Sequence, residues 1–194
     1  MSFFKKLFNR DTSKDKEAKK QEVHLSLDDA FVHHFIEKGG KFLYCVSEKE
    51  VASNLGQIFT ENAWDKVTCT ESSVKEYLKG FKVKVSTDFQ KDTPFFTTCE
   101  HLISDNGDIL FSSNQLSTHK IASLTDDFIV FARTSQLVRN TGQGLTGIKS
   151  NCKEHIPTNI SAVKNYTLKK DDDNFLNYGN SNSKNLYLLL LEDF

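Results

Sequence analysis

Apolar residues recur along the chain with two alternating periods from about residue 26 onward. Apolar positions three to four residues apart predict amphipathic helices, and short continuous apolar runs predict buried strands. The predicted helices cover residues 26–38, 47–59, 71–79, 117–124 and 134–149, and the predicted strands cover 41–46, 66–69, 95–104, 109–112, 128–132 and 186–191. Strands that alternate with helices indicate βαβ units, so we expect an α/β fold with a mostly parallel, mixed sheet and a β-hairpin.

Two stretches fall outside this pattern and set the expected domain limits. Residues 1–25 are interpreted as a basic amphipathic N-terminal segment with a charged linker, and residues 164–183 as a polar loop. Residues 26–194 then form a single domain of ordinary length. Within residues 2–10, apolar and basic side chains fall on opposite helical faces, Phe3, Phe4, Leu7 and Phe8 against Lys5, Lys6 and Arg10. Such a segment docks on a protein surface, makes weak contact with an anionic membrane surface, or has no role.

Charge and cysteine spacing exclude several functions. The formal net charge of -1 gives no general attraction to nucleic acid, and no apolar run approaches the roughly 18–20 residues of a membrane span. The four cysteines, Cys45, Cys69, Cys99 and Cys152, show no Cys-x-x-Cys spacing and follow no secretory signal. We therefore expect buried, reduced thiols in a cytoplasmic protein that binds no metal and no cofactor. An iron–sulfur cluster would require the fold to gather all four thiols.

The stretch from Cys99 to Gln115 carries the most local information. Two apolar runs flank the Asn106-Gly107 pair, and this arrangement predicts a hairpin with a type I′ turn. The second strand of the hairpin leads directly into four hydrogen-bonding residues, from Ser112 to Gln115. Strand ends that present polar groups are common ligand sites in α/β proteins.

Polar side chains also follow other strands. The second cluster, Thr134 to Gln136, comes after strand 128–132, and a third lies at residues 157–159. Because the carboxyl ends of parallel strands share one edge of a sheet, we expect the first two clusters to be neighbours in a ligand crevice. The alternative is that they only cap helices and form turns. The predicted ligand-binding residues are Asp105, Asn106, Ser112, Ser113, Asn114, Gln115, Ser135, Gln136 and Asn159.

Glu100 is the candidate for a catalytic residue. It is an acid between apolar strand residues, directly before the hairpin. A carboxylate in such a place acts as a nucleophile or as a base with a raised pKa, or it faces solvent from a half-buried strand. Both interpretations stay open at the level of the sequence.

Two further motifs are assigned structural roles. Residues 142–147 match G-x-G-x-x-G, but the dinucleotide fingerprint needs these glycines directly after a strand. Here they are expected about ten residues beyond one, inside a helix, and the acidic residue that should follow is missing. The paired His33 and His34, the Cys99-x-His101 pair and the Cys152-x-x-His155 pair are interpreted as structural or solvated groups rather than metal ligands.

Taken together, the segments resemble the lactate-utilisation (LUD) domain family. The resemblance runs through Cys99-Glu-His-Leu-Ile-Ser-Asp-Asn-Gly-Asp-Ile-Leu-Phe-Ser-Ser-Asn-Gln115 and Asp126-Asp-Phe-Ile-Val-Phe-Ala-Arg-Thr-Ser-Gln-Leu137, and resumes at residues 156–163, 177–179 and 185–191. It covers about residues 25–194. The resemblance is greatest to the small subunit of the bacterial L-lactate oxidation system. It implies a three-layer α/β/α fold like that of the NagB/RpiA/CoA-transferase group.

The resemblance also implies partners. It points to an accessory subunit of a complex that oxidises L-lactate to pyruvate, in which the metal clusters belong to iron–sulfur oxidoreductase subunits. The alternative is an enzyme or binding protein that acts on a small anionic metabolite, an acyl-CoA or a sugar phosphate, at the strand ends. A purely structural module is a third possibility, because fold does not fix function.

Overall fold

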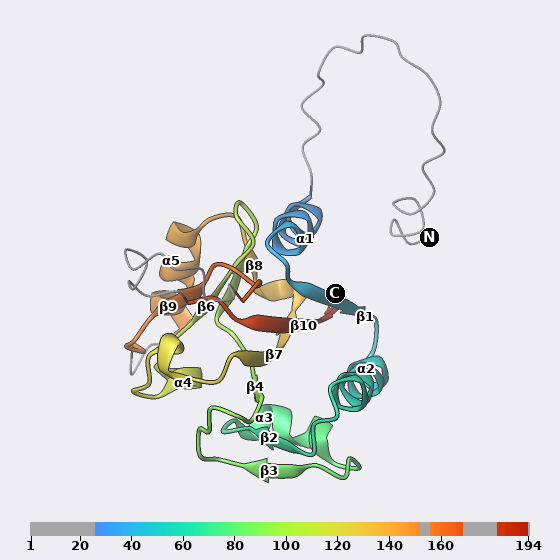
Figure 1. The fold of residues 1–194 in the computed structure, drawn as a ribbon. Helices are drawn as coiled ribbons and strands as arrows, with labels where there is room; N and C mark the ends of the chain where they lie inside the picture. The colour runs from blue at the N-terminus through green and yellow to red at the C-terminus, as the bar shows by residue number, and fades with distance from the viewer. Residues whose placement is uncertain (1–25, 152–155, 169–181, 194) are drawn as a thin grey trace, which may run out of the picture.

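A six-stranded parallel sheet forms the centre of the molecule (Figure 1). The structure is a computed structural model and describes residues 26–151, 156–168 and 182–193. In spatial order, the main sheet comprises β1 (Lys41–Cys45), β10 (Asn185–Leu191), β7 (Asp127–Arg133), β4 (Phe95–Thr97), β2 (Lys66–Thr68) and β3 (Lys84–Ser86). All neighbouring strands of this sheet run parallel. The α/β class that the periodicity predicted is therefore confirmed.

Each face of the main sheet builds its own core. Along β10, Leu186, Leu188 and Leu190 point to one face, whereas Tyr187, Leu189 and Leu191 point to the other. This alternation follows from the two-residue period of a strand. Helix α1 (Leu27–Glu37) and a second sheet cover the first face, and α2 (Glu48–Glu61), α3 (Ser72–Lys75) and the 3-10 turn η2 (Glu76–Leu78) cover the other. The covered sheet is the expected three-layer α/β/α arrangement.

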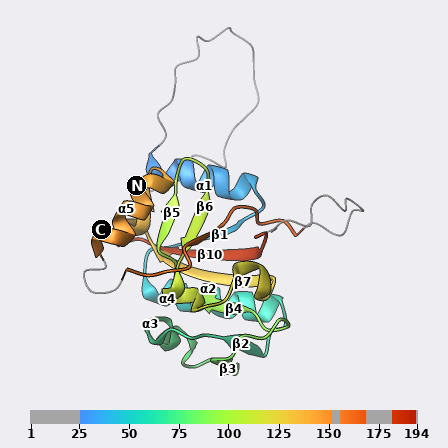
Figure 2. The same cartoon turned by 90° about the vertical axis from the view of Figure 1, so that its left-hand side faces the viewer.

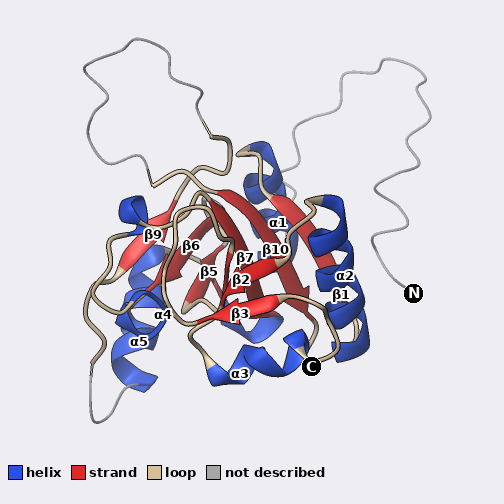
Figure 3. Cartoon of the chain, turned by 60° about the horizontal axis from the view of Figure 1, so that its bottom comes forward, coloured by secondary structure: helices blue, strands red, loops and turns tan. Residues whose placement is uncertain are grey.

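The hairpin belongs to the second sheet and not to the main one. This sheet has the order β8 (Leu137–Val138), β5 (His101–Ile103), β6 (Asp108–Phe111) and β9 (Ser161–Val163). Helix α5 (Thr141–Asn151) packs against β5 and β8, and Figure 3 shows α5 and α2 on opposite sides of the strands. The predicted strand 95–104 is thus wrong as one element. It is β4 and β5, in two different sheets, joined by residues 98–100.

The hairpin turn differs from the predicted type I′ geometry. Residues 104–107 connect the strands, and of these only Gly107 has a positive φ, of 69°. A type I′ turn needs two such residues, so the expectation for Asn106 is wrong. A Cβ atom on Gly107 would lie 2.6 Å from the backbone nitrogen of Phe35, which shows how closely the turn lies against α1 (Figure 2).

The helices on either side of β7 also differ from the prediction. Instead of a helix over 117–124, the chain forms α4 (Ser113–Leu116) and the 3-10 turn η3 (Ile121–Ser123). Ser112 starts α4 early because it forms a capping box with Gln115, and Ser117 ends it with φ 52°. The predicted helix 134–149 is divided into the 3-10 turn η4 (Thr134–Gln136), strand β8 and α5.

Several expectations fall on residues that the structure does not describe. They concern the N-terminal segment 1–25, most of the polar loop (169–181) and Cys152, and they stay predictions. In the described part of the chain, no helix has the length and apolarity that crossing a membrane requires.

Candidate functional site

The polar groups of interest lie where the chain changes direction between the two faces of the main sheet. Neighbouring strands β2 and β4 both end at the carboxyl edge. After β2 the chain enters α3 on the side of α2, and after β4 it enters β5 on the side of α1. Connections that leave adjacent strands toward opposite faces define a topological switch point, where open α/β sheets form ligand crevices. We call the polar residues there the switch-point cluster: Glu71, Thr97, Thr98, Glu100, Ser112, Asn114 and Gln115.

Glu71 fixes the end of β4 to the end of β2. One carboxylate oxygen accepts hydrogen bonds from Thr97 Oγ1 (2.6 Å) and from the Thr98 backbone N–H (2.8 Å), and the other accepts from Thr98 Oγ1 (2.5 Å). Three donors satisfy a half-buried carboxylate well. Glu71 therefore holds the two strand ends together.

Glu100 is oriented by the segment that follows the hairpin. Its Oε1 accepts from Ser112 Oγ (2.5 Å), Asn114 Nδ2 (2.8 Å) and Gln115 Nε2 (3.3 Å). No described residue donates a hydrogen bond to Oε2. The Glu100 carboxylate is thus held in one orientation through Oε1, while Oε2 accepts no hydrogen bond from a described residue. A positioned base or nucleophile requires such an arrangement.

Gln115 connects the two carboxylates. Its Nε2 lies 3.5 Å from Thr98 Oγ1, which binds Glu71, and 3.3 Å from Oε1 of Glu100. Cys99 is buried beside them. Burial, followed by the negative charges of Glu100 and Glu71, raises the pKa of the Cys99 thiol far above its usual value. The thiol therefore stays protonated and does not serve as a nucleophile.

The second polar cluster meets the switch-point cluster through Gln136. The two do not follow neighbouring parallel strands, because β6, which precedes Ser112, belongs to the second sheet and pairs antiparallel with β5. Gln136 Nε2 donates to the backbone oxygens of Cys99 (2.6 Å) and Glu100 (3.3 Å). Ser135 instead faces the chain end, where its N–H and Oγ donate to Asp193 at 2.9 and 2.6 Å. Burial alone would raise the pKa of Asp193, but hydrogen bonds from Ser135 and Thr134 outweigh it and lower this pKa.

Asp105 and Asn106 do not join the switch-point cluster. They lie in the hairpin turn, whereas Glu100 lies at the opposite end of β5. The Asp105 N–H bonds to Arg139 O, and Asn106 Oδ1 accepts from the Asp108 N–H. Both are predicted ligand-binding residues together with Ser112, but a hairpin separates its turn from its base.

Ser113 and Asn159 hold α4 in place. Ser113 Oγ accepts from the Thr158 N–H (3.0 Å), and Asn159 Nδ2 donates to the backbone oxygens of Ser117 and His119. The sequence missed Glu71, which was interpreted as the start of a helix. The sequence signal that could have identified Glu71 is an acidic residue two positions after the predicted strand 66–69.

The G-x-G-x-x-G stretch forms the helix that packs on the second sheet. Its glycines lie nearer to a strand than expected, because β8 ends at Val138 and α5 begins at Thr141. A Cβ on Gly144 would lie 2.9 Å from Leu110 Cδ1, and one on Gly147 would lie 2.6 Å from His101 Nε2. The second and third glycines thus allow close helix–sheet packing, and this position leaves no room for a pyrophosphate at them.

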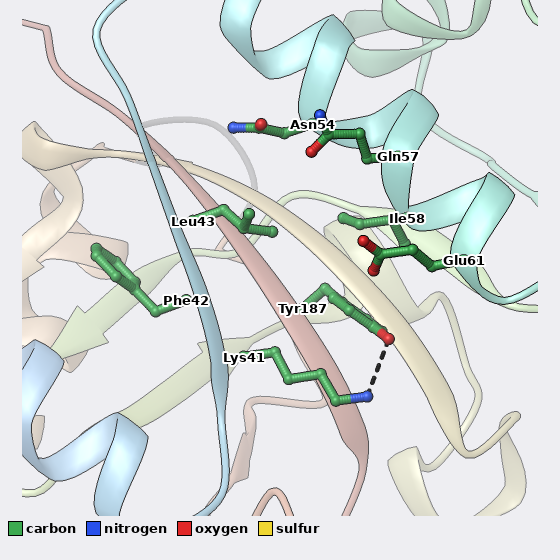
Figure 4. Close-up of a pocket in the computed structure, with 8 residues that line it drawn as sticks. All are labelled: Lys41, Phe42, Leu43, Asn54, Gln57, Ile58, Glu61 and Tyr187. Carbon is green, nitrogen blue, oxygen red and sulfur yellow. Dashed lines mark hydrogen bonds between the residues drawn. The ribbon is translucent and has the colours of Figure 1, made fainter.

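A pocket of about 350 Å³ lies away from the switch-point cluster. It opens between α2 and the amino ends of β1 and β10, with Asn54, Gln57 and Glu61 on the helix side (Figure 4). On the sheet side, Lys41 Nζ donates to Tyr187 Oη at 2.9 Å. No predicted site residue lines this pocket. In the described part of the chain, no three His, Cys, Asp or Glu side chains are grouped to hold a metal ion.

The fold and the site define an α/β protein with a cluster of hydrogen-bonded polar side chains at a switch point of its sheet. A crystal structure of a DUF162 family protein from Deinococcus radiodurans is similar, with a TM-score of 0.61 at 14% sequence identity. The match covers 87% of this chain and 99% of that chain. DUF162 is the LUD-domain family, so the fold that the resemblance implied is confirmed. No protein-family model matches the chain, and no curated protein matches it.

Proposed function

We propose that this protein is an accessory subunit of an L-lactate-oxidising complex with iron–sulfur partner proteins in the cytoplasm. The observation that carries the proposal is the fold, which this chain shares with a DUF162 family protein over 99% of that protein's length. The LUD-like sequence from Cys99 to Gln115 supports it, because these residues build both the hairpin and the base of the switch-point cluster. The partner would contact the side where the hairpin lies against α1.

Affinity purification from the source organism, grown on L-lactate, tests this proposal. The tagged full-length protein is expected to recover iron-containing proteins in stoichiometric amounts, measured by mass spectrometry and iron analysis. Deletion of the gene should slow growth on lactate and leave growth on glucose unchanged. Recovery of the protein without any iron–sulfur protein, together with normal growth on lactate, would rule out the accessory role.

The orientation of Glu100 favours a second candidate function, in which the crevice binds or converts a small anionic metabolite such as an acyl-CoA or a sugar phosphate. Glu100 would act as nucleophile or base, and Gln115 and Asn114 would hold its carboxylate. Because Glu71 and Glu100 repel negative charge, the ligand must turn a neutral group toward them, for example a thioester carbonyl or a hydroxyl.

Thermal-shift measurements against CoA esters, sugar phosphates and organic acids test the second candidate. A binding ligand should raise the melting temperature, and Glu100→Gln should alter that rise because it removes the charge while keeping the side-chain shape. Glu76→Gln, on an exposed turn and 68% exposed at its side chain, is the matched control. An unchanged melting temperature across the panel, or equal behaviour of both variants, would contradict a role for Glu100.

A further inference from the structure

The outer edge of β3 pairs with no other strand in the described part of the chain. β3 is the last strand of the main sheet, beside β2, and Figures 1 and 2 show it at the margin of the molecule. Its outward backbone groups can therefore pair with a further strand. Such pairing is a common way to bind an extended peptide, because main-chain hydrogen bonds supply affinity and side chains supply selectivity.

Lysines gather at this edge without acidic partners. Lys66 and Lys84 lie side by side in the register of β2 and β3, and Lys82 comes two residues earlier. All three are exposed, and none forms an ion pair with a described residue. Like charges on neighbouring strands repel each other. An acidic segment at this edge would relieve that repulsion.

A groove with an aromatic lining adjoins the same edge, and Asp65 and Lys82 also line it. It has a volume of about 240 Å³ and lies between the end of α2 and the segment before β3, where Phe59, Trp64 and Phe81 line it. The rings of Phe59 and Phe81 meet edge to face at 5.8 Å. Gly56 permits this position, since a Cβ there would lie 2.7 Å from the Phe81 ring. On β3 itself, Val85 remains 46% exposed.

The register of β2 and β3 places their lysine and valine side chains on opposite faces of the sheet. Val85 is the register neighbour of Val67, which is buried in the core on the side of α2. Because side chains alternate along a strand, Lys66 and Lys84 face the other side. A strand added beside β3 would meet lysines on one face and apolar groups on the other.

We propose that the edge of β3 binds an extended acidic segment of a partner protein, in which acidic and apolar residues alternate. The segment adds to the main sheet as a further strand. Its carboxylates lie near Lys66 and Lys84, and its apolar side chains contact Val85 and the groove that Trp64 lines. The lysines also select the partner, because they repel basic strands and discourage pairing between copies of this edge.

Fluorescence of Trp64 provides a direct test, because the chain has one tryptophan. The probe is a capped peptide of alternating Glu and Val, titrated into the full-length protein. The emission of Trp64 should change with saturation. Lys84→Glu should weaken binding at least about tenfold, and so should an increase from about 50 mM to about 500 mM salt. Lys49→Glu changes an exposed lysine on α2 that forms no ion pair with a described residue. It makes the same charge change elsewhere and should alter binding less than about twofold.

Three outcomes would overturn the proposal. The first is that neither Trp64 emission nor the anisotropy of a labelled peptide responds to the probe. The second is that Lys49→Glu weakens peptide binding as much as Lys84→Glu does, because the effect would then reflect net charge alone. The third is that an alternating Lys and Val peptide, or a single-stranded oligonucleotide, binds more tightly than the acidic peptide. Circular dichroism of each variant checks that the fold is intact.

Discussion

At the scale of single residues, the carboxyl edge of the sheet is held together by acids that accept hydrogen bonds from hydroxyl groups. Glu71 binds two threonines at the end of β4, Glu100 binds Ser112, and Asp193 binds Thr134 and Ser135 after β7. Bonds to ionised oxygens are stronger than neutral ones, so these acids add side-chain contacts to the strand ends beyond the backbone pairing.

Asp193→Asn should reduce the free energy of unfolding at neutral pH by about 1 kcal/mol, because the amide replaces one of the two accepting oxygens. The pKa of Asp193 is lowered in the folded state. Its stabilisation is therefore complete above the pKa of an unfolded-chain Asp, about 3.9, and is lost as the pH falls through the lower folded-state pKa.

Urea unfolding of both proteins at about pH 7 and about pH 3 measures this difference. The difference in the free energy of unfolding between wild type and Asp193→Asn should be smaller at the lower pH. Asp92→Asn, at an exposed position with no hydrogen bond to a described residue, should show no gap at either pH. A gap that widens in acid would contradict the assigned hydrogen bonds.

At the scale of elements, α5 shows how little a local motif reveals when its packing is unknown. At the start of α5, the Gln143 N–H donates to Asn140 Oδ1, which is a local contact. Only the second sheet explains why two of the glycines of α5 are needed. Gly144 and Gly147 face β6 and β5 at contact distance, whereas Gly142 meets only Asn140 within 4 Å. One sequence pattern therefore contains positions with opposite responses to substitution.

Gly147→Ala should lower the free energy of unfolding by about 1–2 kcal/mol, because its Cβ displaces His101 and the penalty exceeds the gain in helix propensity. His101 Nδ1 also lies 3.2 Å from the backbone oxygen of Gln136, and displacement would break this contact. Gly142→Ala should leave stability unchanged or raise it by up to about 1 kcal/mol. Thermal and urea unfolding of both variants check the contrast, and a stabilising Gly147→Ala would show that α5 packs differently.

At the scale of the whole molecule, periodicity revealed the parallel core but not the division into two sheets. The run from Phe95 to Ser104 begins and ends with apolar strand residues, so it was predicted as one strand. Thr97, Thr98 and Glu100 interrupt the apolar residues where the chain passes from β4 to β5. The break is set by Glu71, which binds Thr98 from another strand end. Glu100 was recognisable from its apolar neighbours. Glu71 was not, because its role depends on β2 lying next to β4.

The shared sheet should make the two cores unfold together. Cys99 is buried in the core on the side of α1, and Cys45 and Cys69 are buried in the core on the side of α2. Strands β1, β10, β7 and β4 of the main sheet contribute side chains to both cores, so loss of one core exposes the other. Burial raises the pKa of Cys69 to about 11, which lowers its thiolate fraction in the native state.

Pulsed thiol labelling in urea tests this cooperativity in a Cys152→Ser protein, which leaves these three thiols. The native protein should label very slowly, and mass spectrometry should find Cys45, Cys69 and Cys99 modified with one common midpoint. If Cys99 reacts at lower urea than the other two, the hairpin sheet opens as a separate unit. In that case the base of the hairpin, and with it the orientation of Glu100, would be the least stable part of the described fold.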